Sequence, residues 1–296
     1  MTARAAFWGR AKATGRAVVW IAVFALVGGA ASWALYRLGP APSPGWWLAW
    51  GALASAVGFA LATWLVGRVL DHRSWAELGW RPRGGVPRAL GAGTAIGVVM
   101  AAGAVGLALL AGGARFTATG EWAGWGKAAL PLGVGFLLAA LTEELMFRGY
   151  PLRRLADALG AGPATAVGAI GFGLAHLGNP SATAFSTLNV ALAGVWLACA
   201  FFSPGAMPLA WGAHFGWNAT LALGFRAPVS GYAFPVPAVA YRAGARSWID
   251  GGAFGPEGGI VATLVMLAGT AAVVLWSRRA VPTLRDAGRG SGGEAP

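Results

Sequence analysis

The sequence predicts an all-α protein, a polytopic membrane bundle of about eight transmembrane helices. Hydrophobic residues make up 57% of the chain and charged residues only 11%, whereas a soluble domain carries roughly 25% charged residues. Several apolar runs also reach about 20 residues, the length that a helix needs to cross about 30 Å of hydrocarbon. The alternating pattern of a membrane β-barrel is absent. Helices are therefore expected to satisfy the backbone hydrogen bonds within the bilayer.

Apolar runs bounded by charged residues, proline and glycine divide the chain into eight expected spans. They lie near residues 17–37, 46–68, 88–113, 128–150, 162–179, 184–203, 206–225 and 259–277. The first run is longer than the apolar core of a signal peptide, so we interpret it as a retained helix. Glycine and alanine are frequent in these runs, which permits close helix packing in lipid.

The rest of the chain is predicted to form tails and loops around one domain. We expect a basic cytoplasmic segment at residues 1–16, a single transmembrane domain at 17–277 and a basic, disordered tail at 278–296. Residues 71–87 are interpreted either as a short interfacial helix or as a solvated loop. Residues 226–258 are interpreted as an ordered external loop, with a lid or a shallow re-entrant piece as the alternative.

The distribution of basic residues predicts the orientation of the chain. The formal net charge is +12, but the basic residues lie at the ends of apolar runs and form no single basic face. Membrane topology explains them better than binding to nucleic acid, which we do not expect. With eight spans, both tails and the even-numbered loops share the more basic side. We therefore expect an integral protein of the cell (plasma) membrane, with the lipid bilayer as its surroundings and both termini in the cytoplasm.

Few ionisable residues fall within the expected spans. Glu143 and Glu144 are the only carboxylates there, and His176 and His214 are the only imidazoles. An ionisable residue at the centre of a span costs at least about 2.5 to 3.5 kcal/mol, so each one requires an explanation. Any one of them alone is more simply a packing residue, but their gathering in three short segments favours function.

Helical spacing separates the roles of the two carboxylates. Glu144 and Arg148 are four residues apart, in the favourable orientation for an intrahelical ion pair, so Glu144 is interpreted as structural. Glu143 has no local cation and is expected to find its partner, His176, on another helix. If the two helices formed a plain hairpin, however, Glu143 and His176 would differ in membrane depth by about 10 Å. A broken helix, a tilt, or a dip of residues 150–160 into the membrane would remove this mismatch.

A third helix is expected to carry two more polar groups. His214 and Asn218 are four residues apart and share one helical face. An imidazole and an amide so placed are suitable donors to an oxyanion. Taken alone, Asn218 would instead be interpreted as a polar contact between helices.

These segments resemble the signature of the CPBP family of CAAX proteases and bacteriocin-processing enzymes, also called the Abi family. The family pattern is Glu-Glu-x-x-x-Arg, then Phe-x-x-x-His, then His-x-x-x-Asn or Asp, on successive membrane helices. The chain matches all three parts without substitution, at Glu143, Glu144 and Arg148, at Phe172 and His176, and at His214 and Asn218. The resemblance covers about residues 128–225.

The resemblance implies an intramembrane endopeptidase that acts on a protein or peptide substrate. In that reading Glu143 activates a water with help from His176, and His214 and Asn218 bind the oxyanion. Glu144, Arg148 and Phe172 would support the site.

Dependence on a metal stays open at this point. Glu143, His176 and His214 would supply three ligands to a divalent metal such as Zn, the usual number in a catalytic site. Only Glu144 would then remain as a base, and a His-Glu-x-x-His helix is absent. We favour a glutamate and histidine mechanism without an obligatory metal.

Two other functions are compatible with these residues. Intramembrane Glu and His side chains also relay protons in transporters, although no inverted repeat is visible in the chain. The protein would alternatively be a catalytically silent scaffold or immunity protein that retains the motifs for packing.

Overall fold

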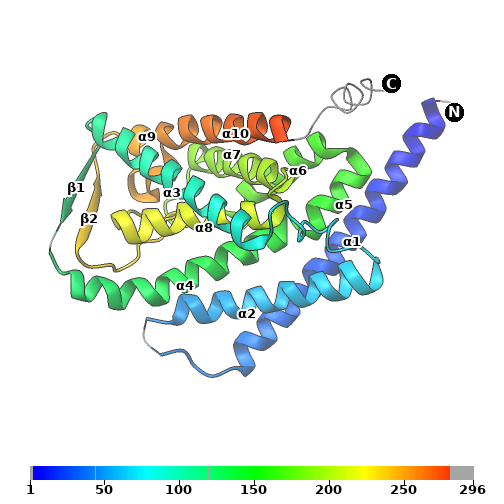
Figure 1. The fold of residues 1–296 in the computed structure, drawn as a ribbon, viewed down its shortest axis with the longest axis horizontal. Helices are drawn as coiled ribbons and strands as arrows, with labels where there is room; N and C mark the ends of the chain where they lie inside the picture. The colour runs from blue at the N-terminus through cyan, green and yellow to red at the C-terminus, as the bar shows by residue number, and fades with distance from the viewer. Residues whose placement is uncertain (1–2, 44, 119, 281–296) are drawn as a thin grey trace, which may run out of the picture.

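The computed structural model describes residues 3–43, 45–118 and 120–280, and over these residues the chain is mainly helical. The expected all-α bundle is confirmed (Figure 1). All eight expected spans coincide with helices. These are α1 (Ala3–Leu38), α2 (Trp47–Ala62) with its π-helical continuation η1 (Thr63–Leu70), α3 (Val86–Leu110), α4 (Trp122–Phe147), α6 (Ala161–Ala175), α7 (Ala184–Phe201), α8 (Ala206–Ala219) with its continuation η2 (Thr220–Gly224), and α10 (Ile260–Ala280).

Six helical segments of the described chain are long and apolar enough to cross a membrane. They are Trp8–Leu38, Trp47–Leu70, Val86–Leu110, Trp122–Leu159, Ala184–Phe201 and Ile260–Arg279. The other two expected spans are shorter, since α6 has 15 residues and α8 has 14. The described residues thus contain six segments with the length and composition of a full span, compared with the eight that were expected.

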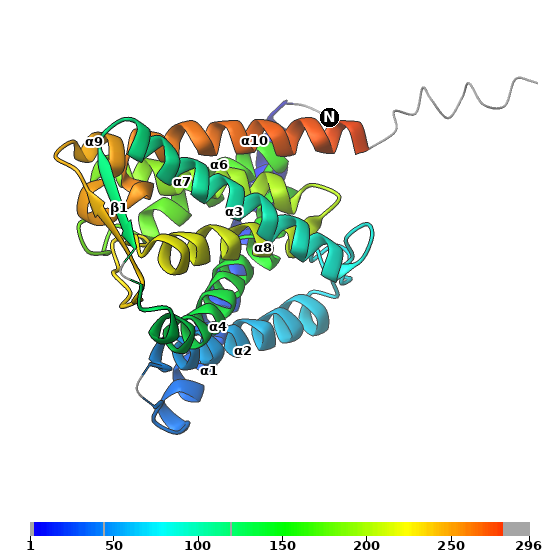
Figure 2. The same cartoon turned by 60° about the vertical axis from the view of Figure 1, so that its left-hand side comes forward.

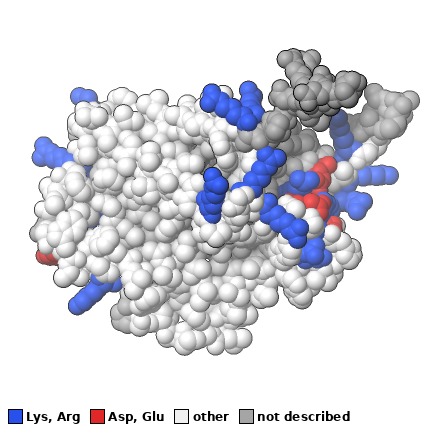
Figure 3. Space-filling model, in the orientation of Figure 1, with Lys and Arg blue, Asp and Glu red and all other residues white. Residues whose placement is uncertain are grey.

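α1 begins and α10 ends toward the same end of the molecule (Figure 1). Because α1 begins at Ala3, residues 3–16 of the expected basic segment do not stand apart but continue the first span as helix. Basic side chains gather toward this end, while most of the visible surface is uncharged (Figure 3). The expected disordered tail lies outside the described residues from residue 281 onward.

A break after α4 positions the site. α4 ends at Phe147, and a separate helix, α5 (Tyr150–Leu159), carries the chain further in the direction of the α1 start (Figure 1). Gly160, whose φ of 87° favours glycine, then reverses the chain into α6. Because α5 lengthens the outward path and α6 has only 15 residues, α6 ends beside the last turn of α4. Of the three ways to remove the depth mismatch, the structure has the broken helix.

The helix α8 lies inside the bundle and packs against α3, α4 and α7, as the layers in Figure 2 show. Its contact with α3 is made backbone to backbone at Gly93, Gly97, Gly212 and Gly216. A β-carbon at any of these four glycines would collide with a carbonyl oxygen of the facing helix. The close approach that small residues permit in membrane helices thus fixes the position of α8 along its axis.

The structure distinguishes between the two interpretations of each long loop. Residues 71–85 form turns and no helix, in agreement with the solvated-loop interpretation. The segment 226–258 contains the strand β2 (Val239–Ala243), which pairs antiparallel with β1 (Ala114–Ala118). It also contains the short helix α9 (Ser247–Asp250) and the 3-10 turns η3 (Gly252–Phe254) and η4 (Pro256–Gly258). This segment closes one end of the bundle and forms a wall of the site.

Candidate active site

Three helices bring the predicted residues together around one cavity of about 410 Å³. Glu143 comes from the last turns of α4, His176 follows the end of α6, and His214 and Asn218 come from α8. All four side chains line the cavity, together with Phe172. The volume lies within the range of small-ligand sites. The helix break and the close packing of α3 on α8 thus assemble the residues of the three motifs.

Glu143 lies between the two imidazoles. Its Oε2 atom is 3.9 Å from Nε2 of His176 and 3.8 Å from Nε2 of His214. Within the described residues this oxygen has no hydrogen-bond partner. Both distances exceed that of a direct hydrogen bond. The sequence predicted His176 as the partner of this carboxylate, and the structure adds His214 at an equal distance.

The orientation of His176 is fixed by its own helix. Its Nδ1 atom is 2.8 Å from the carbonyl oxygen of Phe172. A carbonyl only accepts hydrogen bonds, so Nδ1 carries the proton and donates it. In the neutral imidazole the Nε2 lone pair therefore faces Glu143.

The second carboxylate holds the other imidazole. The Oε1 atom of Glu144 is 3.2 Å from the Arg148 guanidinium, which confirms the ion pair predicted from the four-residue spacing. The same oxygen is 2.8 Å from Nδ1 of His214. Glu144 and Arg148 are only 0% and 2% exposed. Glu144 therefore does more than pair with Arg148, because it also orients a histidine on another helix.

The ring of Phe172 links both histidines to Arg148. The guanidinium carbon of Arg148 lies 4.1 Å from the ring centroid, in cation–π geometry. The ring also packs edge-on against His176 at 4.8 Å and His214 at 6.1 Å between centroids. The supporting role expected of Phe172 thus has a physical basis in this packing.

Asn218 presents an unbonded amide. Its side chain is 9% exposed and lines the cavity one helical turn beyond His214. No hydrogen bond joins this amide to another described side chain or backbone group. Its two N–H donors are thus available to a ligand in the cavity.

A second hollow of about 310 Å³ adjoins Glu143 from the other side, between α1, α2 and α4. It shares Leu48, Ala139 and Glu143 with the first cavity. Its remaining wall consists of Tyr36, Trp47, Gly51, Ala52, Ser55 and Thr142. Glu143 thus lines both hollows.

The use of a divalent metal by Glu143, His176 and His214 stays a prediction. Glu143, His176 and His214 come together, but across the described ranges no group of three or more His, Cys, Asp or Glu side chains has the arrangement that would hold a metal ion. We therefore derive no chemical step through a metal.

Sequence reasoning missed one residue of the cavity wall, Glu257. It is 9% exposed and accepts hydrogen bonds from Trp217 Nε1 at 2.8 Å and from Ser230 Oγ at 3.0 Å. A signal was present, because Asp250 and Glu257 are the only carboxylates in residues 226–258 of a chain with ten acidic residues.

The fold and the site together define a class, that of integral membrane proteins with a carboxylate and two imidazoles around an internal cavity. Residues 125–220 match the family described as type II CAAX prenyl endopeptidase Rce1-like. The match contains all three motifs and agrees with the predicted family over the part of the chain that carries them. At the level of the family, the activity is that of a peptide hydrolase. No curated protein and no solved structure matches the chain.

Proposed function

We propose that the chain is an intramembrane endopeptidase of the CAAX-protease type that hydrolyses a peptide bond in the cavity next to Glu143. The observation that carries the proposal is the position of the Glu143 carboxylate 3.9 and 3.8 Å from two imidazole nitrogens, in a cavity that also contains the free amide of Asn218. The family match supports the reaction class.

The first step is the activation of water. A separation of nearly 4 Å between polar atoms suits a bridging water. Glu143 takes a proton from that water, and the lone pair on Nε2 of His176 orients it, since its Nδ1–H is bound to the Phe172 carbonyl. The water oxygen then attacks the carbonyl carbon of the peptide bond. General-base help of this kind contributes typically 10²- to 10⁴-fold.

The second step is the stabilisation of the oxyanion. Asn218 donates one N–H to it. His214 donates from Nε2 only in its doubly protonated form, because its Nδ1–H is already given to Glu144, and the Glu144 carboxylate supplies the counter-charge for that form. The C–N bond then breaks, and the proton held by Glu143 passes to the leaving amine nitrogen.

The test compares Glu143→Gln with Glu121→Gln, an exposed glutamate that precedes the same helix. Cells that carry each variant are examined by comparative proteomics for an uncleaved membrane protein or peptide. Glu143→Gln should cause it to accumulate at an unchanged level of folded protein, whereas Glu121→Gln should not. Equal cleavage per folded molecule in wild type and Glu143→Gln would refute the proposal and favour a silent scaffold.

A metal-independent mechanism is part of the proposal. Cleavage by the purified protein should survive exhaustive chelation. Loss of activity with o-phenanthroline and its recovery with added Zn would overturn this part.

A further inference from the structure

Glu257 lies in the wall of the catalytic cavity but outside the segment that matches the family. It belongs to η4, in the external segment, and its side chain is 9% exposed. Its backbone carbonyl is held by the Asn189 amide of α7 at 2.9 Å. The carboxylate is thus held at a fixed place in the cavity, remote in sequence from the three motifs.

The partners of this carboxylate are all neutral donors. Oε1 accepts from the Trp217 indole, and Oε2 accepts from the backbone N–H and the hydroxyl of Ser230. Both oxygens act as acceptors, which is the pattern of an ionised carboxylate. Glu144, the buried glutamate that binds His214, has Arg148 as its counter-ion. Glu257 has no ion-pair partner in the described chain, and a buried charge without one is costly.

This carboxylate lines the same cavity as Glu143, His176, His214 and Asn218. Trp217, whose indole binds Glu257, directly precedes Asn218, the donor to the oxyanion. The same cavity is also lined by apolar side chains such as Phe136, Leu197 and Met266. A substrate whose scissile bond lies at Glu143 thus occupies a cavity whose wall also contains apolar side chains and the carboxylate of Glu257.

We propose that Glu257 is a subsite for a cationic group of the substrate, an ammonium or guanidinium close to the scissile bond. The proposal rests on the proposed function, because it takes the cavity to be the substrate site. Its test measures binding alone and does not depend on that function. Each carboxylate oxygen accepts up to two hydrogen bonds, and Oε1 accepts one from Trp217, so one acceptor position remains for the cation. The cation belongs either to a Lys or Arg side chain or to a free α-amino group.

The test measures the binding of three small probes to the purified full chain in nonionic detergent. Nα-acetyl-lysine butylamide carries its cation on the side chain, leucine butylamide carries it on the α-amino group, and Nα-acetyl-leucine butylamide is neutral. Isothermal titration gives Kd for each probe with wild type, Glu257→Gln and Glu143→Gln. One of the cationic probes should bind about 10- to 100-fold more tightly than the neutral probe, as for hydrogen bonds to charged groups. The tighter of the two identifies the source of the cation.

The two glutamine variants remove one cavity carboxylate each and serve as matched controls. The preference should disappear in Glu257→Gln and persist in Glu143→Gln. Equal affinities for all three probes, no binding of any probe, or a preference that follows Glu143 would overturn the proposal. Should Glu257→Gln fail to fold by circular dichroism, the preference measured in Glu143→Gln still decides between the two carboxylates. A protein that lacks peptidase activity can still pass or fail this test, because no cleavage is measured.

Discussion

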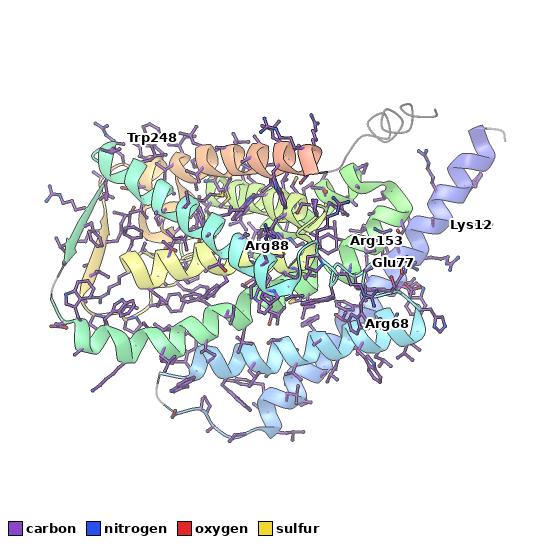
Figure 4. All side chains as sticks on the ribbon, in the orientation of Figure 1. Lys12, Arg68, Glu77, Arg88, Arg153 and Trp248 are labelled. Carbon is purple, nitrogen blue, oxygen red and sulfur yellow. The ribbon has the colours of Figure 1, made fainter. Side chains whose placement is uncertain are left out.

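Two clusters of charged side chains join separate segments of this protein, and they differ in their access to water. At the site, Glu144 joins Arg148 of its own chain segment to His214 of α8, and all three are buried. The peripheral cluster joins residues 71–77 to α5 through Arg73, which contacts Asp71 at 3.0 Å and Asp157 at 2.7 Å. Glu77, Arg153 and Arg154 complete it. Figure 4 labels two of these residues, Glu77 and Arg153, at the end of the molecule where α1 begins.

The peripheral cluster has more ion pairs, but each is partly exposed and worth little. The buried cluster has fewer bonds and leaves one oxygen of Glu144 and one nitrogen of Arg148 without a partner. Because the pair is buried, removal of either charge would leave the other in the interior without a counter-charge. The comparison teaches that the burial of a cluster, and not its number of ion pairs, determines how much stability is lost when one of its charges is removed.

The largest effect is expected from Glu144→Gln. This change leaves the Arg148 guanidinium buried without its counter-charge, and removal of one partner of a buried pair costs about 3 to 5 kcal/mol. Unfolding in detergent, followed by circular dichroism, measures the loss. Glu77→Gln in the peripheral cluster is the matched control. Equal losses in the two variants would break the comparison.

Asn218→Ala tests whether a polar group without a partner in the described chain contributes to turnover rather than to stability. Removal of one oxyanion donor costs about 10²- to 10³-fold in kcat, or roughly 3 to 4 kcal/mol of transition-state stabilisation. Its stability should hardly change, because the Asn218 amide bonds no other described residue. Full turnover per folded molecule would exclude Asn218 from the reaction. Asn218→Asp keeps the size of the side chain but offers no donor when ionised, and it should also be slow.

Two of the cation–π contacts, Arg148 over Phe172 and Arg68 over Trp75, form a matched pair for the next test. Phe172→Leu removes the ring over buried Arg148 and should cost about 2 kcal/mol, the value for a desolvated contact. Trp75→Leu removes the more exposed ring beneath Arg68, at 5.6 Å, and should cost about 0.5 to 1 kcal/mol. Chemical unfolding of both variants provides the measurement. A larger loss in the Trp75 variant would contradict the argument from burial.

The smallest effect is expected from Asp157→Asn, which removes two ion pairs of the peripheral cluster. Its stability should fall by no more than about 1 kcal/mol. The difference from wild type should shrink further at high salt, because exposed charges are screened. A loss that does not respond to salt would mean that this cluster behaves like the buried one.

The sequence predicted those features that depend on local spacing. Long apolar runs gave the positions of the helices, and the four-residue interval gave the Glu144–Arg148 pair. The contact between Glu144 and His214 was not predictable in this way, because it joins residues on two helices and depends on how α8 is placed. For the same reason, spacing could not reveal that Glu143 has a second imidazole neighbour.

The helix break left a signal that the expected span of 128–150 overlooked. Gly149 and Pro151 lie where α4 ends and α5 begins, and proline is favoured in the first turn of a helix. Glu257 was harder to find. Its importance comes from hydrogen bonds with Trp217 and Ser230, which are distant in sequence, and no helical periodicity links these residues.

The break has an electrostatic consequence. α4 and α6 both finish at the cavity, so the carboxyl ends of two helices, each carrying a partial negative charge from the macrodipole, converge on it. Such a field stabilises the Arg148 guanidinium beside the last turn of α4. It opposes any anion, including the oxyanion that peptide hydrolysis forms. The donors that offset this field must then come from a helix that passes the cavity without ending there, and α8, which continues into η2 beyond Asn218, is such a helix.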